Sequence, residues 1–261
     1  MVGSLNTARR SLGGFGDQAA GLSFGGYTTV VVATTEKYDG LFWSADTDLN
    51  TARQYLAGCG TTLAGVSFGG STTTVIANAE DYDGAAWANS NSLNTARRQL
   101  GGAGTQLAGL SFGGYTTTES AATEEYDGAS WTAANDLNVA RYGLAGCGLQ
   151  GSGLCFGGHA STGVAGTTEE YDGATWTASN DLNDVREGLA GAGTQVDGLS
   201  FGGYNFSNVG TTEAYDGACW SISRDLNTSR TNLGGNGIGT AALSFGGYTT
   251  ENSIASEEYT R

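Results

Sequence analysis

Short apolar segments alternate with glycine and small polar residues along the whole chain. The segment LGGAGTQLAGLSFGG, residues 100–114, predicts two short strands around a polar turn, with the double glycine ending the second strand. After a loop rich in threonine, TEEYDG at 123–128 predicts a third strand and a turn, and ASWTA at 129–133 predicts a fourth strand. Because no segment between them has the length or period of a helix, the pattern predicts an all-β chain.

This four-strand pattern occurs six times, and each copy carries the same marker residues. Phe24 and Phe68, which begin two successive FGG triplets, are 44 residues apart, and the later intervals keep this value to within one residue. The FGG triplets begin at Phe24, Phe68, Phe112, Phe156, Phe201 and Phe245. The recurrent tyrosines are Tyr38, Tyr82, Tyr126, Tyr171, Tyr215 and Tyr259, and the recurrent tryptophans are Trp43, Trp87, Trp131, Trp176 and Trp220. A fixed period of this length indicates a repeat architecture.

The order of the marker residues within a unit resembles the kelch repeat. Gly113-Gly114 is followed by Tyr126, Trp131 and Arg141, in the kelch order of double glycine, tyrosine, tryptophan and arginine. The proline usual before that arginine is absent, because the chain has LNTAR or LNVAR there. The composition and the FGG and TEEYDG motifs also resemble those of kelch-like repeat arrays of marine phages. The resemblance implies a β-propeller of the kelch and galactose-oxidase-like superfamily, with strand one innermost.

The residues of strand one support the same architecture independently. Segments such as LGGAG at 100–104 contain almost no bulky side chain, and glycine and alanine let backbones approach closely where inner strands crowd around an axis. Four antiparallel strands per unit, repeated around a ring, also leave few exposed strand edges. We therefore expect one domain over residues 1–261, a six-bladed β-propeller of four-stranded antiparallel blades with strand one at the hub.

The sixth blade is expected to be incomplete. Ten residues separate Tyr126 from Leu137, and they include the tryptophan strand, whereas Thr260–Arg261 and Met1–Ser4 together supply only six residues and no tryptophan. The sixth blade then has three good strands, or it takes a fourth from another chain or from sequence beyond the one given. This blade is therefore a predicted point of self-association.

Composition and charge argue against some classes of partner. The chain has 261 residues with 45 glycines and no proline, and its formal net charge is −15. An acidic surface repels phosphate backbones and anionic membranes, so we expect neither nucleic acid nor a membrane as a partner. No run of 18 apolar residues and no export leader is visible. The compartment stays undetermined, and only the phage resemblance suggests a virion or extracellular location.

Acidic and basic residues recur at one fixed place in every unit. A glutamate lies two residues before each recurrent tyrosine, on the same packed face of its strand, and a carboxylate there needs a partner. An arginine recurs equally faithfully, so we expect one structural Glu–Arg pair per unit; a catalytic or metal site would normally be singular. The glutamates are Glu36, Glu80, Glu124, Glu169, Glu213 and Glu257. The arginines are Arg9, Arg53, Arg97, Arg141, Arg186 and Arg230.

The chain offers little for catalysis or metal binding. His159 is the sole histidine, so neither the copper site of kelch-fold oxidases nor a Ser–His–Asp arrangement finds its residues. The four cysteines lack any C-x-x-C spacing and are interpreted as small buried residues: Cys59, Cys147, Cys155 and Cys219. The double glycines are interpreted as strand ends with unusual dihedral angles, because no helix start follows them to bind phosphate. We expect no enzyme, no catalytic residue, no metal and no cofactor.

The residues directly after the double glycines are the candidate ligand-binding set. Sixfold symmetry would place them in one ring on the face where strand two leaves the hub: Tyr27, Ser71, Tyr115, His159, Tyr204 and Tyr248. Tyrosine suits sugar stacking and protein contacts, although these rings could also merely cover neighbouring loops. Our leading hypothesis is a non-enzymatic interaction or structural module, in the setting of a phage virion or fibre, that binds a protein or glycan through these loops. A carbohydrate-binding propeller is the alternative, and an enzyme of unknown type is the third.

Overall fold

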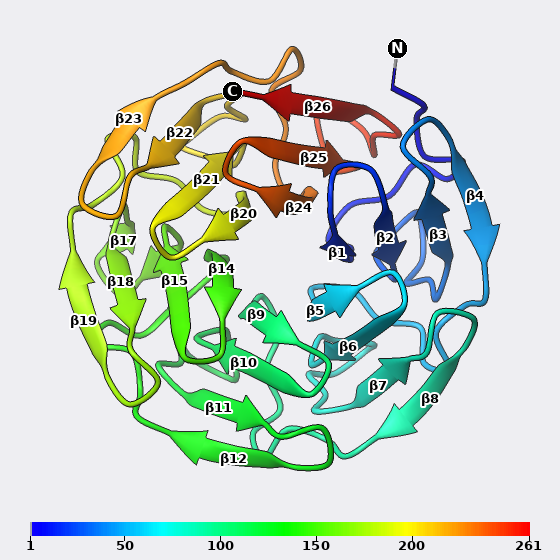
Figure 1. Cartoon of the computed structure of the whole chain (residues 1–261), viewed down its shortest axis with the longest axis horizontal. Coiled ribbons are helices and arrows are strands. Elements are labelled where there is room, and N and C mark those ends of the chain that lie inside the picture. The colour runs from blue at the N-terminus through cyan, green and yellow to red at the C-terminus, as the bar shows by residue number, and fades with distance from the viewer. Residues whose placement is uncertain (1) are drawn as a thin grey trace.

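The computed structural model describes residues 2–261, and every regular element among them is a β-strand, as the sequence predicts. No helix within that range is available to cross a membrane. The 26 strands form seven antiparallel sheets, five of four strands and two of three. The large sheets follow one another around a ring in chain order, an arrangement compatible with a β-propeller-like repeat fold (Figure 1).

Each large sheet runs from the centre of the ring toward its rim in chain order (Figure 1). The first contains β1 (Gly13–Gly16), β2 (Gly21–Phe24), β3 (Thr35–Tyr38) and β4 (Trp43–Asp46). The second contains β5 (Ala57–Thr61), β6 (Ala64–Phe68), β7 (Ala79–Tyr82) and β8 (Trp87–Ser90), and the third contains β9 (Gly101–Thr105), β10 (Ala108–Phe112), β11 (Thr123–Tyr126) and β12 (Trp131–Ala134).

The remaining large sheets keep this order, but the last has three strands where the others have four. The fourth contains β14 (Ala145–Leu149), β15 (Ser152–Phe156), β18 (Thr168–Tyr171) and β19 (Trp176–Ser179). The fifth contains β20 (Ala190–Thr194), β21 (Asp197–Phe201), β22 (Thr212–Tyr215) and β23 (Trp220–Ile222). The last contains β24 (Gly234–Ile238), β25 (Ala241–Phe245) and β26 (Ser256–Thr260).

A seventh, small sheet corrects the expectation of six sheets. It consists of β13 (Arg141–Tyr142), β16 (His159–Ala160) and β17 (Gly163–Val164), in the loops of the fourth unit. At the corresponding place in the other units only single bridges form, for example between Arg98 and Tyr115, so no strand results there. The loop after Gly158 is one residue longer than its counterparts, and two residue pairs form here instead of a single bridge.

The first strands of neighbouring sheets lie side by side around the centre, with β1 next to β5 and also next to β24 (Figure 1). Glycine makes this approach possible. A Cβ atom built on Gly102 would lie 2.8 Å from the Cζ atom of Phe68 in the preceding sheet and 3.2 Å from the carbonyl oxygen of Gly58. Small residues are therefore required in the inner strands, as the sequence predicts.

A closed circle of main-chain hydrogen bonds joins all six units just before their first strands. Each member has a positive φ of 52–64°, and its N–H donates to the carbonyl oxygen of the member in the preceding unit. The members of this axial circle are Ser11, Tyr55, Gln99, Gly143, Gly188 and Asn232. The N–H of Ser11 donates to the carbonyl oxygen of Asn232 over 2.8 Å, so the first unit is bonded to the last as it is to its chain neighbour.

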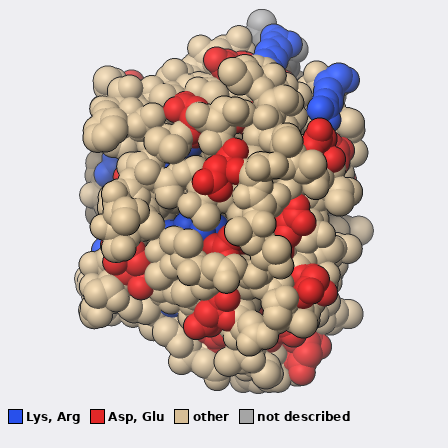
Figure 2. All heavy atoms as spheres, turned by 90° about the vertical axis from the view of Figure 1, so that its left-hand side faces the viewer, with Lys and Arg blue, Asp and Glu red and all other residues tan. Residues whose placement is uncertain are grey.

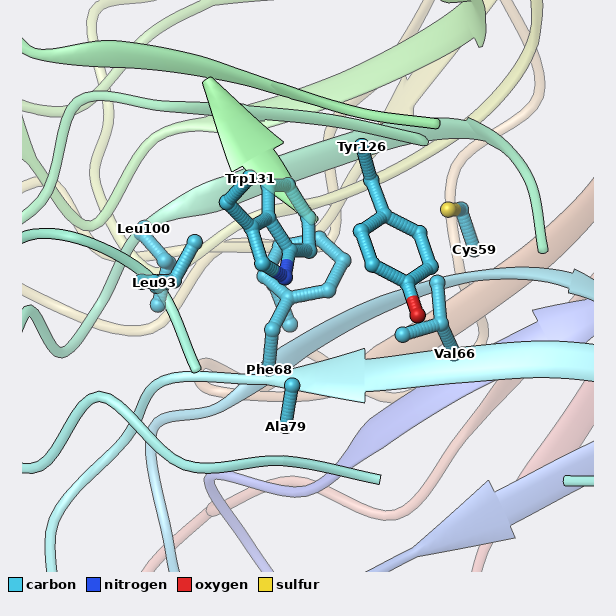
Figure 3. Packing of buried hydrophobic residues seen from close by; sticks show 9 residues of the cluster. Cys59, Val66, Phe68, Ala79, Leu93, Leu100, Tyr126 and Trp131 are labelled. Carbon is cyan, nitrogen blue, oxygen red and sulfur yellow. The ribbon is translucent and has the colours of Figure 1, made fainter. Parts of the chain in front are cut away.

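Aromatic side chains fill the space between neighbouring sheets (Figure 3). The ring centroid of Trp131 on β12 lies 4.8 Å from that of Phe68 in the preceding sheet and 4.9 Å from that of Tyr126. All three rings are buried. The hydroxyl of Tyr126 donates to Asp81 over 3.2 Å, which ties the third strands of the two sheets together. The recurrent tyrosines and tryptophans therefore pack between sheets, as the sequence predicts.

Candidate functional site

In every unit the recurrent arginine lies beside the recurrent glutamate. The Nη2 atom of Arg9 is 2.9 Å from Oε1 of Glu36, and the distances in the other units lie between 2.7 and 3.3 Å. Arg9 also donates to the carbonyl oxygens of Gly25 and Thr34, and Glu36 accepts the N–H of Asn6. The pair thus connects the double glycine, the third strand and the LN segment, a geometry that suits a structural role.

Burial lowers the pKa of five of the six arginines, because removing water disfavours the charged guanidinium. Burial acts on Arg141 as well, but the nearby Cys155 and Glu169 outweigh it and raise the pKa of this arginine. The pKa of Arg53 falls to about 10 through burial, and the nearby carboxylate of Glu80 opposes that fall. The pKa of Arg9 is lowered by burial as well. The guanidinium groups still stay charged at neutral pH, so they can hold a carboxylate but cannot act as bases.

Each residue after a double glycine pairs through the main chain with a second residue, one that sequence reasoning missed. Tyr27 bridges to Arg10, and Tyr204 bridges to Glu187. Ser71 is buried, whereas Tyr204 is 38% exposed. The missed residues directly follow the recurrent arginines: Arg10, Gln54, Arg98, Tyr142, Glu187 and Thr231. The sequence could have revealed them, because these residues vary from unit to unit whereas the arginine before each of them does not. We call the surface formed by these residues and their partners the variable face.

Three of the predicted tyrosines lie against arginines on the variable face. The Cζ atom of Arg10 is 4.8 Å from the ring centroids of both Tyr27 and Tyr248. The Cζ atom of Arg98 is 5.2 Å from the ring centroid of Tyr115. These cation–π contacts leave the three rings half-buried, so much of their area is already used within the fold.

An open cavity of about 380 Å³ interrupts the variable face on one side of the axis. Its lining comes from the fourth, fifth and sixth units and from the axial circle: Gln99, Tyr142, Glu187, Gly188, Tyr204, Thr231 and Asn232. The axial circle has glycine at 143 and 188, where the other four units carry side chains. The absence of two side chains explains why the face is hollow here and filled elsewhere.

The cavity combines one carboxylate with aromatic rings. The carboxylate of Glu187 forms no hydrogen bond or ion pair with any side chain in residues 2–261. Burial raises the pKa of Glu187, and the nearby His159 opposes that rise. The ring of Tyr142 stacks on His159 with centroids 5.1 Å apart, and Tyr204 also lines the cavity. A hydrogen-bond acceptor in the same cavity as aromatic rings suits a polar ligand with an apolar face, such as a sugar or a basic side chain.

The axis of the ring holds narrower spaces with little chemistry. Cavities of about 110 and 180 Å³ follow one another along the first strands and are lined in equivalent positions by all six units. Their only titratable side chains are the thiols of Cys59 and Cys147. Burial raises the pKa of Cys59 to about 12 and raises that of Cys147 further, so neither thiol is a nucleophile at neutral pH.

The cysteines match the sequence interpretation at three positions of four. Cys59, Cys147 and Cys155 are buried, but Cys219 is exposed, so its assignment as a buried residue was wrong. It lies in the turn between β22 and β23, where its N–H donates to Asp216 over 2.7 Å and its side chain points outward. Within residues 2–261 no group of three or more histidine, cysteine or acidic side chains comes together as a metal site.

The outer surface is predominantly acidic. Figure 2 shows one side of the rim, where aspartate and glutamate side chains are spread over the surface and basic side chains are few. Most of the chain's positive charge is enclosed, since the six recurrent arginines are fully buried. Each buried arginine is paired with a recurrent glutamate, so the formal net charge of −15 falls on the rest of the chain, which favours a neutral or basic ligand.

No protein-family model matches the chain, and no curated protein matches it. The resemblance to kelch repeats and phage arrays therefore rests on the marker residues alone, and function has to be argued from geometry.

Proposed function

We propose that the six large sheets are the blades of one six-bladed propeller that forms a single domain. Two contacts between the first and last units support this proposal: β1 lies next to β24, and the axial circle returns from Asn232 to Ser11. The small sheet of β13, β16 and β17 belongs to the loops of the fourth unit and adds no blade. A last blade of three strands is compatible with a ring that closes at its hub.

This propeller serves as a non-enzymatic binding module, and its variable face is the surface that binds a protein partner. The observation that carries this proposal is the contrast between the interior and this face. The buried Glu–Arg pairs and aromatic contacts repeat from unit to unit. On the variable face, by contrast, the residue after the recurrent arginine is of five different types in the six units, and the face opens into one cavity beside Glu187. Binding proteins commonly vary the loops that a rigid scaffold presents.

A photo-crosslinking residue in place of Tyr204 tests this function. The control carries the same residue in place of Ser44, on the rim strand β4. When the protein is irradiated together with proteins of its natural source, the residue at position 204 should give a discrete adduct. Excess unlabelled chain should prevent formation of this adduct, whereas an excess of the Tyr142→Ala/Tyr204→Ala chain should not. Equal adducts at both positions, or adducts that neither competitor displaces, would count against a binding role for the variable face.

A carbohydrate is the second candidate ligand, favoured by the composition of the cavity wall. Tyr142 and Tyr204 offer ring faces, and Glu187, Gln99 and Asn232 offer hydrogen-bonding groups for hydroxyls. On a glycan array, the native chain and an Arg10→Ala control should bind the same sugars, and Glu187→Gln should lose them. If the array shows no binding, or if Glu187→Gln binds as the native chain does, the carbohydrate candidate is rejected.

A further inference from the structure

The five four-stranded sheets hold their outer strand in the same way. The tryptophan of the outer strand inserts between the tyrosine of its own sheet and the phenylalanine of the preceding sheet, as Trp131 does between Tyr126 and Phe68 (Figure 3). The carbonyl oxygen of Trp131 also accepts a hydrogen bond from the amide of Asn94 over 2.8 Å. The same asparagine contact occurs in all five sheets.

The indole N–H of the tryptophan has its own partner in the preceding sheet. In four of the five sheets it donates to a hydroxyl on the first residue of the preceding sheet's third strand. Trp220 donates to Thr168 over 3.0 Å in this way, and equivalent bonds are made by Trp43, Trp87 and Trp176. At Trp131 the equivalent residue is Ala79, which offers no acceptor. Ring packing, the asparagine contact and the indole hydrogen bond thus define a tryptophan socket between neighbouring sheets.

The socket between the fifth and last sheets is empty. Strand β26 pairs with β25 on one edge, and no strand in residues 2–261 lies along its other edge. A cavity at this place is lined by Phe201, Thr212, Asn227 and Tyr259, which correspond to the four residues that hold tryptophan elsewhere. Tyr259 is only half-buried here, whereas its counterparts are buried.

The groups that hold a tryptophan elsewhere lack that partner in this socket. The Oγ1 atom of Thr212 is buried and has no hydrogen-bond partner, and Thr212 as a whole is 1% exposed. The amide of Asn227 donates to Glu257 over 2.7 Å but has no tryptophan carbonyl to bind. The side chain of Glu257 is 14% exposed, against 0–3% for the glutamates in the other ion pairs of this kind. Thr212, Asn227 and Glu257 therefore all point to one missing ligand.

Residues 2–261 do not supply this ligand. Residues 2–4 lie against the first sheet, where the N–H of Gly3 donates to the carbonyl oxygen of Leu41 over 3.0 Å. All five tryptophans of the chain already occupy their own sockets. A second copy would have to give up a strand of its own to donate one, which favours a strand from a different polypeptide as the occupant.

We infer that the outer edge of β26 binds a β-strand of another polypeptide that carries a tryptophan. The strand pairs antiparallel with β26, its indole ring enters between Phe201 and Tyr259, and its indole N–H donates to Thr212. The chain's own outer strands give the expected sequence, Asp-Gly-x-x-Trp followed in most units by serine or threonine. This is β-strand addition with one specificity pocket, in which main-chain hydrogen bonds supply affinity and the tryptophan supplies selectivity.

A labelled peptide with the sequence DGASWTAAND, taken from residues 127–136, tests the inference. It should bind the chain saturably in fluorescence anisotropy and raise the melting temperature with increasing concentration. The same peptide with alanine in place of tryptophan should bind at least about a hundredfold more weakly, because a buried anchor dominates such an interface. Failure of the tryptophan peptide to bind below about 1 mM, or equal binding of both peptides, would overturn the inference.

Two variants and one fusion locate the binding. Thr212→Val removes the acceptor of the indole N–H and should lower the affinity for the peptide about fivefold, which corresponds to the loss of one hydrogen bond. Thr168→Val, at a socket that is already occupied, should leave the affinity for the peptide unchanged. A chain extended after Arg261 by the same ten residues should melt at a higher temperature than its alanine counterpart and should no longer bind free peptide. Equal effects of the two valine variants, or peptide binding that persists in the extended chain, would place the peptide elsewhere and refute the socket.

Discussion

Removal of Arg141 tests the structural role of the buried ion pairs. The Nη1 atom of Arg141 is 2.7 Å from Oε1 of Glu169, and both side chains are 0% exposed. Breaking a buried pair by removing one partner costs about 3–5 kcal/mol, because the other charge stays buried without compensation. Glu169 keeps the N–H and amide of Asn138 as donors at 2.7 and 2.8 Å, so we expect a loss near the lower end for Arg141→Ala. In a chain of this size such a loss lowers the melting temperature by about 6–12 °C.

The matched control is Arg10→Ala, which removes an arginine next to the recurrent position. Arg10 is half-buried and has two cation–π contacts but no carboxylate partner, so its removal should cost about 1–2 kcal/mol. Urea denaturation followed by tryptophan fluorescence, together with calorimetry, measures both losses. Adding Glu169→Gln to Arg141→Ala should recover part of the stability, because it removes the unpaired charge. Equal losses in the two arginine variants, or no recovery in the double variant, would refute the reasoning.

Three further predictions follow from the interior. Gly102→Val should cost about 1–3 kcal/mol in urea denaturation through crowding at the hub, whereas Gly151→Ala, whose added Cβ meets no atom within 4 Å, should change stability little; the reverse order would contradict the close packing of the inner strands. A thiol reagent at pH 8 should label only Cys219 in the native chain and all four cysteines after unfolding; fast labelling of a second thiol would contradict the burial of the others. Burial raises the pKa of Tyr38 and of Tyr215 to about 12, above the usual value near 10. Because the protonated phenols favour the folded state, the free energy of unfolding should fall as the pH rises from about 10 to about 12. A free energy of unfolding that stays constant over this range would contradict the prediction.

The sequence was sufficient for features that repeat. Each double glycine, tyrosine and tryptophan occurs at the same place in every copy, so the strands and their packing could be predicted from one unit and applied to the rest. The positive φ values of Gly113 and Gly114 agree with the interpretation of the double glycine as a strand end. The empty outer position of the last sheet followed from the missing tryptophan segment.

Features that depend on a single unit or on closure of the ring were missed. Glu187 and its equivalents vary between units, so they were overlooked beside the invariant arginines. Tyr55 and Gln99 adopt positive φ, a conformation that their side chains disfavour, and only the completed axial circle supplies the hydrogen bonds that hold it. The small sheet depends on one extra loop residue, whose effect on pairing is not visible in the sequence.

The axial circle also separates the stability of this ring from the chemistry of its surface. Its six hydrogen bonds join main-chain atoms alone, and serine, tyrosine, glutamine, glycine and asparagine all occupy its positions. Exchanging one non-glycine residue for another therefore leaves these hydrogen bonds in place, and replacing a glycine adds the left-handed penalty of about 1–2 kcal/mol. Mutation can thus accumulate at these positions during evolution without opening the ring, and the entrance to the cavity can be redesigned for a new ligand by introducing a side chain at Gly143, where an added Cβ would meet no atom closer than 3.5 Å.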